Sequence, residues 1–231
     1  MPSRTKLVIE DGVAWLSLDD AKVNALSREM IDEIDRALDA AEEAQAIPVL
    51  RGRAGIFSAG FDLKTFAQGA AAGAAMVRAG AELVLRLLAF PRPVVTVCTG
   101  HAYPAGAFLM LAADVRFGAA GPWQIGLNEV AIGLTVPRFA VELARHRLVP
   151  AGLARVASAT MFPPEEALRL GYLDRVVSPE TLDREVRGEV ERLRTLDAPS
   201  FVATKARANE PAIVAIQTAL EEEWQEQPGA A

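Results

Sequence analysis

The sequence predicts an α/β protein built on a mostly parallel β-sheet. Three short apolar runs, Ile47–Leu50, Val94–Val97 and Val115–Phe117, have the length of buried strands. Helical stretches separate them, and a helix between two strands is the usual connection in a parallel sheet. Beyond residue 177 almost every segment reads as helix. We therefore expect an α/β core over residues 1–178 and a helical C-terminal region over residues 179–231.

The composition is that of a globular protein and excludes several functional classes. Of the 231 residues, 51% are hydrophobic and 23% are charged, which is ordinary for a folded domain. The formal net charge of −6 provides no basic surface for a nucleic acid, and no apolar stretch approaches the roughly 20 residues of a membrane span. The single cysteine, Cys98, lies in an apolar run and reads as a small buried side chain. With no internal disulfide and no signal-peptide pattern, we expect a cytoplasmic protein.

The N-terminal segments read as a hairpin followed by a helix. Leu7–Glu10 and Val13–Leu18 alternate apolar and polar residues around Asp11-Gly12, a dipeptide typical of tight hairpin turns. Ser27 is a good helix N-cap, and the apolar residues after it follow helical spacing. These apolar residues are Met30, Ile31, Ile34, Leu38 and Ala41.

The middle of the chain contains a glycine-rich loop and an alanine-rich stretch. Arg51–Gly60 reads as a strand that ends in a loop, and Phe61–Phe66 reads as a short helix. Gln68–Gly80 is rich in alanine and glycine and has no strong apolar stripe, which favours a mobile segment. Glu82–Phe90 follows as a helix that ends where Pro91 begins a proline pair.

The second half of the chain is mainly helical. Gly106–Ala113 is apolar all round, so we expect a buried helix there. A short strand is expected at Asp174–Val177. The other predicted helices are Arg138–Arg147, Ala151–Ala159, Pro164–Leu170, Glu180–Leu196 and Ser200–Gln225.

Few residues of the chain suit nucleophilic or metal chemistry. The chain has two histidines: His101 follows a predicted strand, and His146 lies beside two arginines on an expected solvated helix face. No serine lies in a nucleophile-elbow pattern, and no ligand cluster has the spacing of a known metal site. Phosphate-binding glycine motifs are also absent from the sequence. We therefore expect carboxylates and backbone N–H groups to carry the chemistry, without a metal or cofactor.

Two loops are suited to present backbone donors. Phe57–Leu63 and Gly100–Ala107 are rich in small residues, which let a ligand approach the main chain. The second loop opens the predicted buried helix, whose first N–H groups have no acceptor within the helix. Two such groups can hold a carbonyl oxygen that becomes an oxyanion. The alternative is that these residues only form turns and pack closely.

Several segments, taken in their order and spacing, resemble the crotonase (enoyl-CoA hydratase/isomerase) superfamily over roughly residues 7–178. The resemblance implies a crotonase (ClpP-like) α/β fold, with twisted parallel sheets of ββα units and a C-terminal helical trimerisation region. It also implies an acyl-CoA substrate, of which coenzyme A is a part, and a homotrimer or a dimer of trimers. The matching segments are Asn24–Leu26, Phe57–Leu63, Arg92–Val94, Gly100–Ala102, Ala105-Gly106, Ala113-Asp114, Ile125–Glu129, Gly133, Pro163–Leu168, Gly171 and Val176-Val177.

The same resemblance implies roles for individual residues. The N–H groups of Phe61 and Ala105 match the family's oxyanion hole, although the second position is commonly glycine; Gly106 is the fallback donor. Glu129 matches the catalytic acid/base, whereas read without the resemblance it is an ordinary surface carboxylate. The positions that match the substrate and CoA-binding residues are Val23, Ala25, Leu26, Ala59, Asp62, Leu63 and Phe108.

Phe108 decides between the reactions of this family. Hydratases carry a first glutamate at this position, and hydration needs that group as well as the one at Glu129. The Ile125–Glu129 and Phe162–Leu168 strings look like the mitochondrial-type Δ3,Δ2-enoyl-CoA isomerases. The expected function is therefore conversion of 3-enoyl-CoA to trans-2-enoyl-CoA in fatty-acid degradation. A hydratase, or a weakly catalytic acyl-CoA-binding protein, is the alternative.

Three more charged residues match positions of the family. Asp62 is expected to shape its loop, and Asp114 is expected to be structural. Lys205 falls where some relatives hold CoA phosphates, but it also reads as a solvated lysine on a helix.

Overall fold

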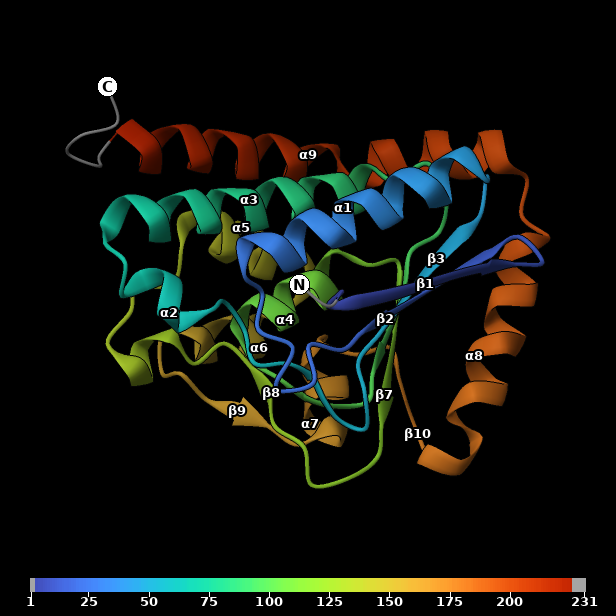
Figure 1. Ribbon diagram of the computed structural model, residues 1–231, viewed down its shortest axis with the longest axis horizontal. Helices are drawn as coiled ribbons and strands as arrows, with labels where there is room; N and C mark the ends of the chain where they lie inside the picture. Colours follow the sequence, from blue (N-terminus) through green and yellow to red (C-terminus); the bar gives the residue numbers. More distant parts are fainter. Residues whose placement is uncertain (1–2, 226–231) are drawn as a thin grey trace.

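The computed structural model describes residues 3–225, which form two β-sheets surrounded by helices (Figure 1). The strands are β1 (Thr5–Glu10), β2 (Val13–Leu18), β3 (Ile47–Arg51), β4 (Gly55–Ser58), β5 (Val95–Cys98), β6 (Gly100–Ala102), β7 (Val115–Ala119), β8 (Ile125–Gly126), β9 (Met161–Phe162) and β10 (Arg175–Val177). The helices are α1 (Arg28–Glu43), α2 (Leu63–Phe66), α3 (Ala70–Ala89), α4 (Pro104–Ala112), the 3-10 helix η1 (Glu129–Ile132), α5 (Arg138–Arg147), α6 (Pro150–Val156), α7 (Pro164–Leu170), α8 (Pro179–Arg194) and α9 (Ala198–Gln225).

The predicted hairpin and the first helix are confirmed. β1 and β2 pair antiparallel, and Asp11 and Gly12 between them have positive φ angles of 48° and 72°. Two successive left-handed residues make the turn whose twist matches that of the strands, and glycine adopts this conformation without steric cost. Ser27 caps α1, its hydroxyl accepting the N–H of Met30 at 3.3 Å.

The larger sheet has the order β1-β2-β3-β5-β7-β10 and is parallel from β2 onward, as expected for an α/β fold. One face packs against α8, at the right of Figure 1. Valines and a phenylalanine of the strands meet an apolar stripe of α8 there, which explains why α8 holds a fixed place against the sheet. The residues of this contact include Val49, Val95, Val97 and Phe117 of the sheet and Leu182, Val186, Val190 and Leu193 of α8.

The main core lies on the other side of this sheet. Helices α1, α3 and α9 lie side by side above it in Figure 1, with α9 packed against α3 and α5. The predicted buried helix is confirmed as α4, in which every residue from Ala105 to Ala112 is buried. Cys98 is also buried, as expected; its Sγ donates to the Gly100 carbonyl at 3.0 Å, and burial raises the pKa of the thiol to about 12.

A smaller sheet has the order β4-β6-β8-β9, and of its strands only β4, within Arg51–Gly60, was predicted from the residue pattern. Its strands have two to four residues, too few to show a period. The sheet nevertheless joins segments that carry the family resemblance, since β4 leads into the 57–63 loop and β6 leads into α4. It therefore sets where these two loops meet.

The prediction of a mobile Gln68–Gly80 segment was wrong. From Ala70 onward these residues form the first half of α3, a continuous 20-residue helix that ends at Ala89. The helix has no side-chain cap and little apolar periodicity, so the two patterns that mark the start of an amphipathic helix are weak here. It is held by packing, because Met76, Ala79, Gly80 and Ala81 face the protein interior and are buried.

Two predictions about single side chains also need correction. Lys205 is neither solvated nor available to phosphates: it is 6% exposed, and its Nζ donates to Asp114 at 2.6 Å. Asp114 also accepts the N–H of Val94, so the pair links α9 to the start of β5 and gives Asp114 the expected structural role. His146 is half-buried and bonds to Asn209 of α9 at 3.1 Å instead of facing solvent.

In the described part of the chain, no helix is long and apolar enough to span a membrane. The predicted boundary between residues 178 and 179 stays a prediction, and the last six residues of the C-terminal region lie outside the described residues.

Candidate active site

Two buried polar residues, Asn24 and Ser58, hold the 57–63 loop in place through hydrogen bonds. Asn24 has a φ of 53° and donates from its side chain to the carbonyls of Leu18 and Phe57, at 2.9 and 3.1 Å. The Ser58 hydroxyl donates to the Asn24 carbonyl at 2.6 Å and accepts the N–H of Gly60 at 3.2 Å. This network fixes the backbone just before Phe61, which explains why the Asn-Ala-Leu and Ser-Ala-Gly-Phe segments occur together.

The start of α4 is attached directly to this loop. The Tyr103 N–H donates to the Ser58 carbonyl at 2.9 Å. A Cβ placed on Gly60 would lie 3.6 Å from the backbone N of Ala105, and one placed on Gly106 would lie 2.7 Å from the Ser58 Cβ. The backbone before Phe61 therefore lies close to the first turn of α4, with room for no more than a methyl group between them.

The N–H groups of Phe61 and Ala105 have no acceptor within the described residues. Phe61 forms a parallel bridge with Leu26, but the bridge bonds use the Gly60 carbonyl and the Asp62 N–H on either side of it. The Phe61 N–H is thus directed away from Leu26. Ala105 is the second residue of α4, where N–H groups lack an intrahelical partner. Both groups are free to bind an oxygen atom of a ligand.

Glu129 is the first residue of η1, and Leu127 and Asn128 separate it from β8. It is only 6% exposed, and neither carboxylate oxygen has a hydrogen-bond partner in the described part of the structure. Burial favours the uncharged form, so the pKa of the carboxyl is raised to about 7. Tyr172 lies near it: burial, and then the charge of Glu129, raise the pKa of its phenol. A carboxyl group with this pKa accepts and returns protons near neutral pH.

A cavity of about 340 Å³ is lined by both Phe61 and Glu129, and by Tyr103 and Pro104 directly before Ala105. Most of its surface is apolar, and Glu129 is the only charged residue among those that line it in the described structure. An unpaired carboxyl group in an apolar cavity, beside backbone donors, is typical of a site for proton transfer. The lining residues are Ala59, Gly60, Phe61, Leu63, Phe66, Val77, Tyr103, Pro104, Phe108, Asn128, Glu129, Ile132, Leu134, Thr135 and Pro137.

Half of the predicted site residues lie on the cavity wall, and the rest lie next to it. Ala59, Phe61, Leu63, Phe108 and Glu129 line the cavity. The 23–26 segment runs beside the 57–63 loop: Val23 accepts the Ala59 N–H, and Leu26 bonds to Gly60 and Asp62. The residues outside the lining are Val23, Ala25, Leu26, Asp62 and Ala105.

Two of these residues, Asp62 and Ala105, have clear structural surroundings. Asp62 is the N-cap of α2 and accepts the Lys64 N–H at 3.1 Å, in agreement with its expected loop-forming role. Ala105 is 1% exposed and follows Pro104 and Tyr103, which are on the cavity wall. Its amide, not its side chain, is the group of interest.

Several wall residues carried no signal in the sequence. Phe66 and Val77 come from α2 and α3, and Ile132, Leu134 and Pro137 come from η1 and the chain after it. Apolar side chains in short or weakly patterned elements cannot be recognised from the sequence as part of a ligand site. His101, by contrast, follows β5 but is not on the wall: its Nδ1 accepts the Gln124 N–H at 3.0 Å, and its ring lies against Tyr103 and Trp123.

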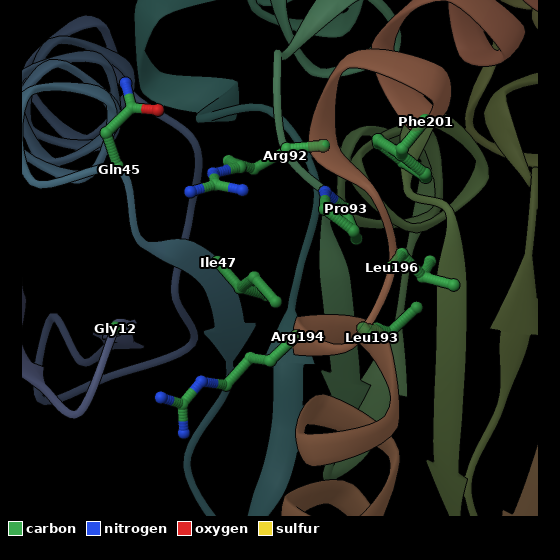
Figure 2. Close-up of a pocket in the computed structure, with 10 residues that line it drawn as sticks. Gly12, Gln45, Ile47, Arg92, Pro93, Leu193, Arg194, Leu196 and Phe201 are labelled. Carbon is green, nitrogen blue, oxygen red and sulfur yellow. The ribbon is translucent and has the colours of Figure 1, made fainter.

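A second depression, of about 190 Å³, has a different character (Figure 2). It lies beside the hairpin turn at Gly12, the start of β3 and the end of α8. Figure 2 shows Arg92 and Arg194 reaching it from different segments, and none of its lining residues is an acid. Because α2 and α8 are on opposite sides of the molecule in Figure 1, this depression is separate from the Glu129 cavity and offers no base for proton transfer.

Comparison with known proteins agrees with this geometry. The family model "Enoyl-CoA hydratase/isomerase" matches residues 8–227. An enoyl-CoA hydratase/isomerase family protein from Pseudomonas syringae is 40% identical, with a TM-score of 0.95 over 96% of this chain and 97% of that one. A Mycobacterium tuberculosis enoyl-CoA isomerase is 35% identical, with a TM-score of 0.92 over 97% of this chain and 99% of that one.

A sequence relative from rat leads to the same family. The mitochondrial enoyl-CoA delta isomerase 1 of Rattus norvegicus is 32% identical over 206 residues, which are 85% of this chain and 70% of the rat protein. A probable enoyl-CoA hydratase of Mycobacterium avium is 34% identical over 87% of this chain and 79% of its own length. The fold, the two joined loops and these similarities have one explanation: the chain belongs to the enoyl-CoA hydratase/isomerase family.

Proposed function

We propose that the protein converts 3-enoyl-CoA to trans-2-enoyl-CoA in fatty-acid degradation, with Glu129 as its acid/base. The observation that carries this proposal is the composition of the cavity wall. Glu129 is the one carboxyl group among the described wall residues. Phe108, also on the wall, is the residue that the family resemblance matches to the first hydratase glutamate. Phe108 is 2% exposed and packs edge-on against Phe61 and Phe139 at ring distances of 6.3 and 5.4 Å. An aromatic ring thus fills the place of a second acid.

A single carboxyl group is sufficient for moving a double bond. The Glu129 carboxylate removes a proton from C2 of the 3-enoyl thioester, and the electron pair of that C–H bond passes into a dienolate. The Phe61 and Ala105 N–H groups bind the thioester oxygen as it gains negative charge. Glu129, now protonated, returns the proton to C4, which leaves the double bond between C2 and C3. Atoms and charge balance without a second acid.

The pKa of Glu129 suits both steps. A pKa of about 7 leaves a substantial fraction of the carboxylate ionised at neutral pH, while the protonated form remains a competent acid. The absence of hydrogen bonds to its oxygens in the described structure keeps the carboxylate reactive, because no donor stabilises its charge. The apolar wall supports binding of a hydrocarbon acyl group.

Hydration of 2-enoyl-CoA is the alternative, and the relatives do not decide between the reactions. The same Mycobacterium tuberculosis protein is described as an enoyl-CoA isomerase and as a probable enoyl-CoA hydratase. Asn128, Tyr103 and Thr135 are polar residues on the wall that could hold a water molecule. None of them is a base at neutral pH, so hydration should be slow.

The test is turnover of both substrates by the wild-type protein. We expect 3-enoyl-CoA to be isomerised at least about 10²-fold faster than 2-enoyl-CoA is hydrated, given what one general base contributes. Faster hydration would identify a hydratase. Turnover of neither substrate, with tight acyl-CoA binding by calorimetry, would identify a binding protein.

We also propose that the chain assembles as a homotrimer or a dimer of trimers. The proposal follows from the family resemblance; in addition, Val202 and Val214 of α9 are 37% and 56% exposed and line one surface depression, so they offer apolar surface to a neighbouring subunit. Sedimentation at micromolar concentration should give a trimer or hexamer. A monomer would contradict the assembly but not the reaction.

A further inference from the structure

The ring of Phe61 lies against a glycine of α3. A Cβ placed on Gly80 would be 2.5 Å from Cζ and 2.6 Å from Cε1 of Phe61, closer than real Cβ contacts occur. Gly80 is in the interior of α3 and is buried. Its φ is not in the left-handed region, so the backbone itself would accept alanine. The ring of Phe61 is therefore what excludes a side chain at this position.

A second glycine of α3 has the same relation to a second ring. Gly73 lies about two helical turns before Gly80, on the same face, and a Cβ there would be 2.7 Å from Cδ1 of Phe66. Val77, between the two glycines, lines the Glu129 cavity, as do both phenylalanines. This face of α3 thus supports the cavity wall by leaving two positions without side chains.

Glycine at these positions opposes helix formation. Glycine in a helix interior is less favourable than alanine, because it loses more backbone freedom on folding. Gly188 of α8 shows that the protein also contains an interior helix glycine with no such contact, since nothing lies within 4 Å of a Cβ placed there. Gly188 is exposed whereas Gly80 is buried, so Gly188→Ala controls for the effect of alanine in a helix interior without a ring contact.

Phe61 has little freedom to adjust to a side chain at position 80. On one side its backbone is joined to Leu26 through the neighbouring Gly60 and Asp62. On the other side its ring contacts Phe108, which is buried and packs against Phe139. Unless it turns into the Glu129 cavity, which it lines and where it would hinder substrate binding, a displaced ring has to move its own Cα or repack two other phenylalanines. Movement of the Cα reorients the peptide that carries the Phe61 N–H.

We propose that Gly80 is a positioning residue for the reaction: by leaving room for the Phe61 ring, it holds the Phe61 N–H in line with that of Ala105. The proposal rests on the proposed function for its kinetic consequence, but the packing it describes does not. Gly73 acts in the same way on Phe66, which carries no donor for the thioester oxygen. Substitution of Gly73 therefore should alter substrate binding, whereas substitution of Gly80 should alter turnover.

The experiment compares Gly80→Ala with Gly188→Ala and Gly73→Ala. A displacement near 1 Å of a reacting group can cost about 10²-fold, so we expect kcat of Gly80→Ala to fall roughly 10- to 100-fold with KM nearly unchanged. Gly188→Ala should keep the wild-type kcat and KM. Gly73→Ala should raise KM more than it lowers kcat.

A second substitution at Phe61 distinguishes a clash with its ring from any other effect of alanine at position 80. The double variant Gly80→Ala/Phe61→Leu retains the residue 61 N–H but has a smaller side chain, so its kcat should return to within a few-fold of that of Phe61→Leu alone. If Gly80→Ala does not fold and the double variant does, the steric relation is supported. Wild-type kcat in Gly80→Ala, or equal loss in the single and double variants, would overturn the proposal.

A binding measurement distinguishes this proposal from the proposed function. In ¹⁵N-phenylalanine-labelled protein, the Phe61 amide resonance should shift when hexanoyl-CoA, a saturated thioester, is added. The shift should be much smaller in Gly80→Ala and wild-type in Gly188→Ala. If the wild-type protein turns over neither enoyl-CoA, the proposed function fails, while this difference still supports the role of Gly80. An unchanged shift in Gly80→Ala would overturn it.

Discussion

Two buried glutamates, Glu129 and Glu189, show opposite uses of the same side chain. Their exposed fractions are almost equal, at 6% and 5%. Glu189 of α8 accepts hydrogen bonds from Arg192 at 2.5 and 3.0 Å and from Arg175 at 2.9 Å. Glu129 has no hydrogen-bond partner in the described residues. Burial alone therefore does not distinguish the two carboxyl groups; what differs is whether each has hydrogen-bond partners.

The pKa values of the two carboxyl groups move in opposite directions for this reason. The Arg192 guanidinium, assisted by Arg175, lowers the pKa of Glu189 below its ordinary value. Burial without a partner raises the pKa of Glu129 to about 7. An ion-paired carboxylate stabilises the structure at neutral pH, whereas an unpaired buried one is costly to ionise. We interpret Glu189 as structural and Glu129 as functional.

The largest expected effect is the difference in turnover between Glu129→Gln and Glu189→Gln. Glu129→Gln keeps the size of the side chain but removes the base, so isomerisation should fall by about 10²–10⁴-fold while acyl-CoA binding persists. Glu189→Gln, at the other side of the molecule, should leave kcat and KM within about two-fold, since it touches no cavity residue. Steady-state kinetics at pH 8 decide this. Comparable losses in both variants would remove the functional distinction.

The amide of Ala105 should matter nearly as much as the Glu129 carboxyl group. Ala105→Pro removes one of the two N–H groups and should lower kcat by roughly 10²–10³-fold. Ala105→Gly retains the N–H and should have nearly wild-type kcat. Circular dichroism should first show that the proline variant is folded. A folded proline variant with wild-type turnover would exclude the Ala105 N–H from the oxyanion site.

The two glutamates should also respond to pH in opposite ways. The folded-state pKa of Glu129 is higher than the unfolded value of 4.5, so the folded protein binds more protons between pH 4.5 and about 7. Its contribution to the free energy of unfolding is thus greatest below pH 4.5 and falls by roughly 3 kcal/mol as the pH rises through about 7. Denaturant unfolding of wild type and Glu129→Gln, subtracted at each pH, should show this fall.

Activity should rise over the same pH range. If the ionised Glu129 carboxylate acts as the base, as proposed, kcat/KM should increase about ten-fold per pH unit well below pH 7 and level off above it. For Glu189 the sign is reversed: its lowered pKa stabilises the protein above pH 4.5, and this contribution is lost as the pH falls through its folded-state pKa. A flat kcat/KM profile between pH 5 and 8 would contradict the Glu129 assignment.

The smallest expected effect is the stability loss in Glu189→Gln. Its arginine partners are about half exposed, with side-chain exposures of 47% and 57%, so solvent weakens each ion pair. We expect a loss of about 1–2 kcal/mol at pH 7, measured by denaturant unfolding. High salt should reduce the difference from wild type. A gain in stability would show that the two arginines do not offset the burial of this carboxylate.

Elements with regular patterns were predictable from the sequence, and elements fixed by distant contacts were not. The hairpin around Asp11-Gly12 and the Ser27-capped helix depend on local turn and capping chemistry, which a single sequence records. The first half of α3 lacks such signals. Its glycines at positions 73 and 80 make room for the rings of Phe66 and Phe61, which are distant contacts that the local sequence does not record. The strands of the smaller sheet are too short for periodicity.

The candidate site shows the same division. The motif around Glu129 identified it as the acid/base candidate, but its lack of partners became visible only once α4, η1 and the 57–63 loop were placed. Lys205 shows the converse. It reads as a surface lysine, yet its partner Asp114 is 91 residues away and buries it. Pairing across such distances is set by packing and has no local signature.

The buried Cys98 provides a way to measure these stabilities without a denaturant. It is the only cysteine in the chain, is 1% exposed, and has a thiol pKa raised to about 12. Alkylating reagents react with the thiolate, so the folded protein should be almost inert, while the opened chain has an ordinary cysteine. The rate of labelling under native conditions therefore reports how often the core around β5 opens. Each variant described above carries this probe at the same position.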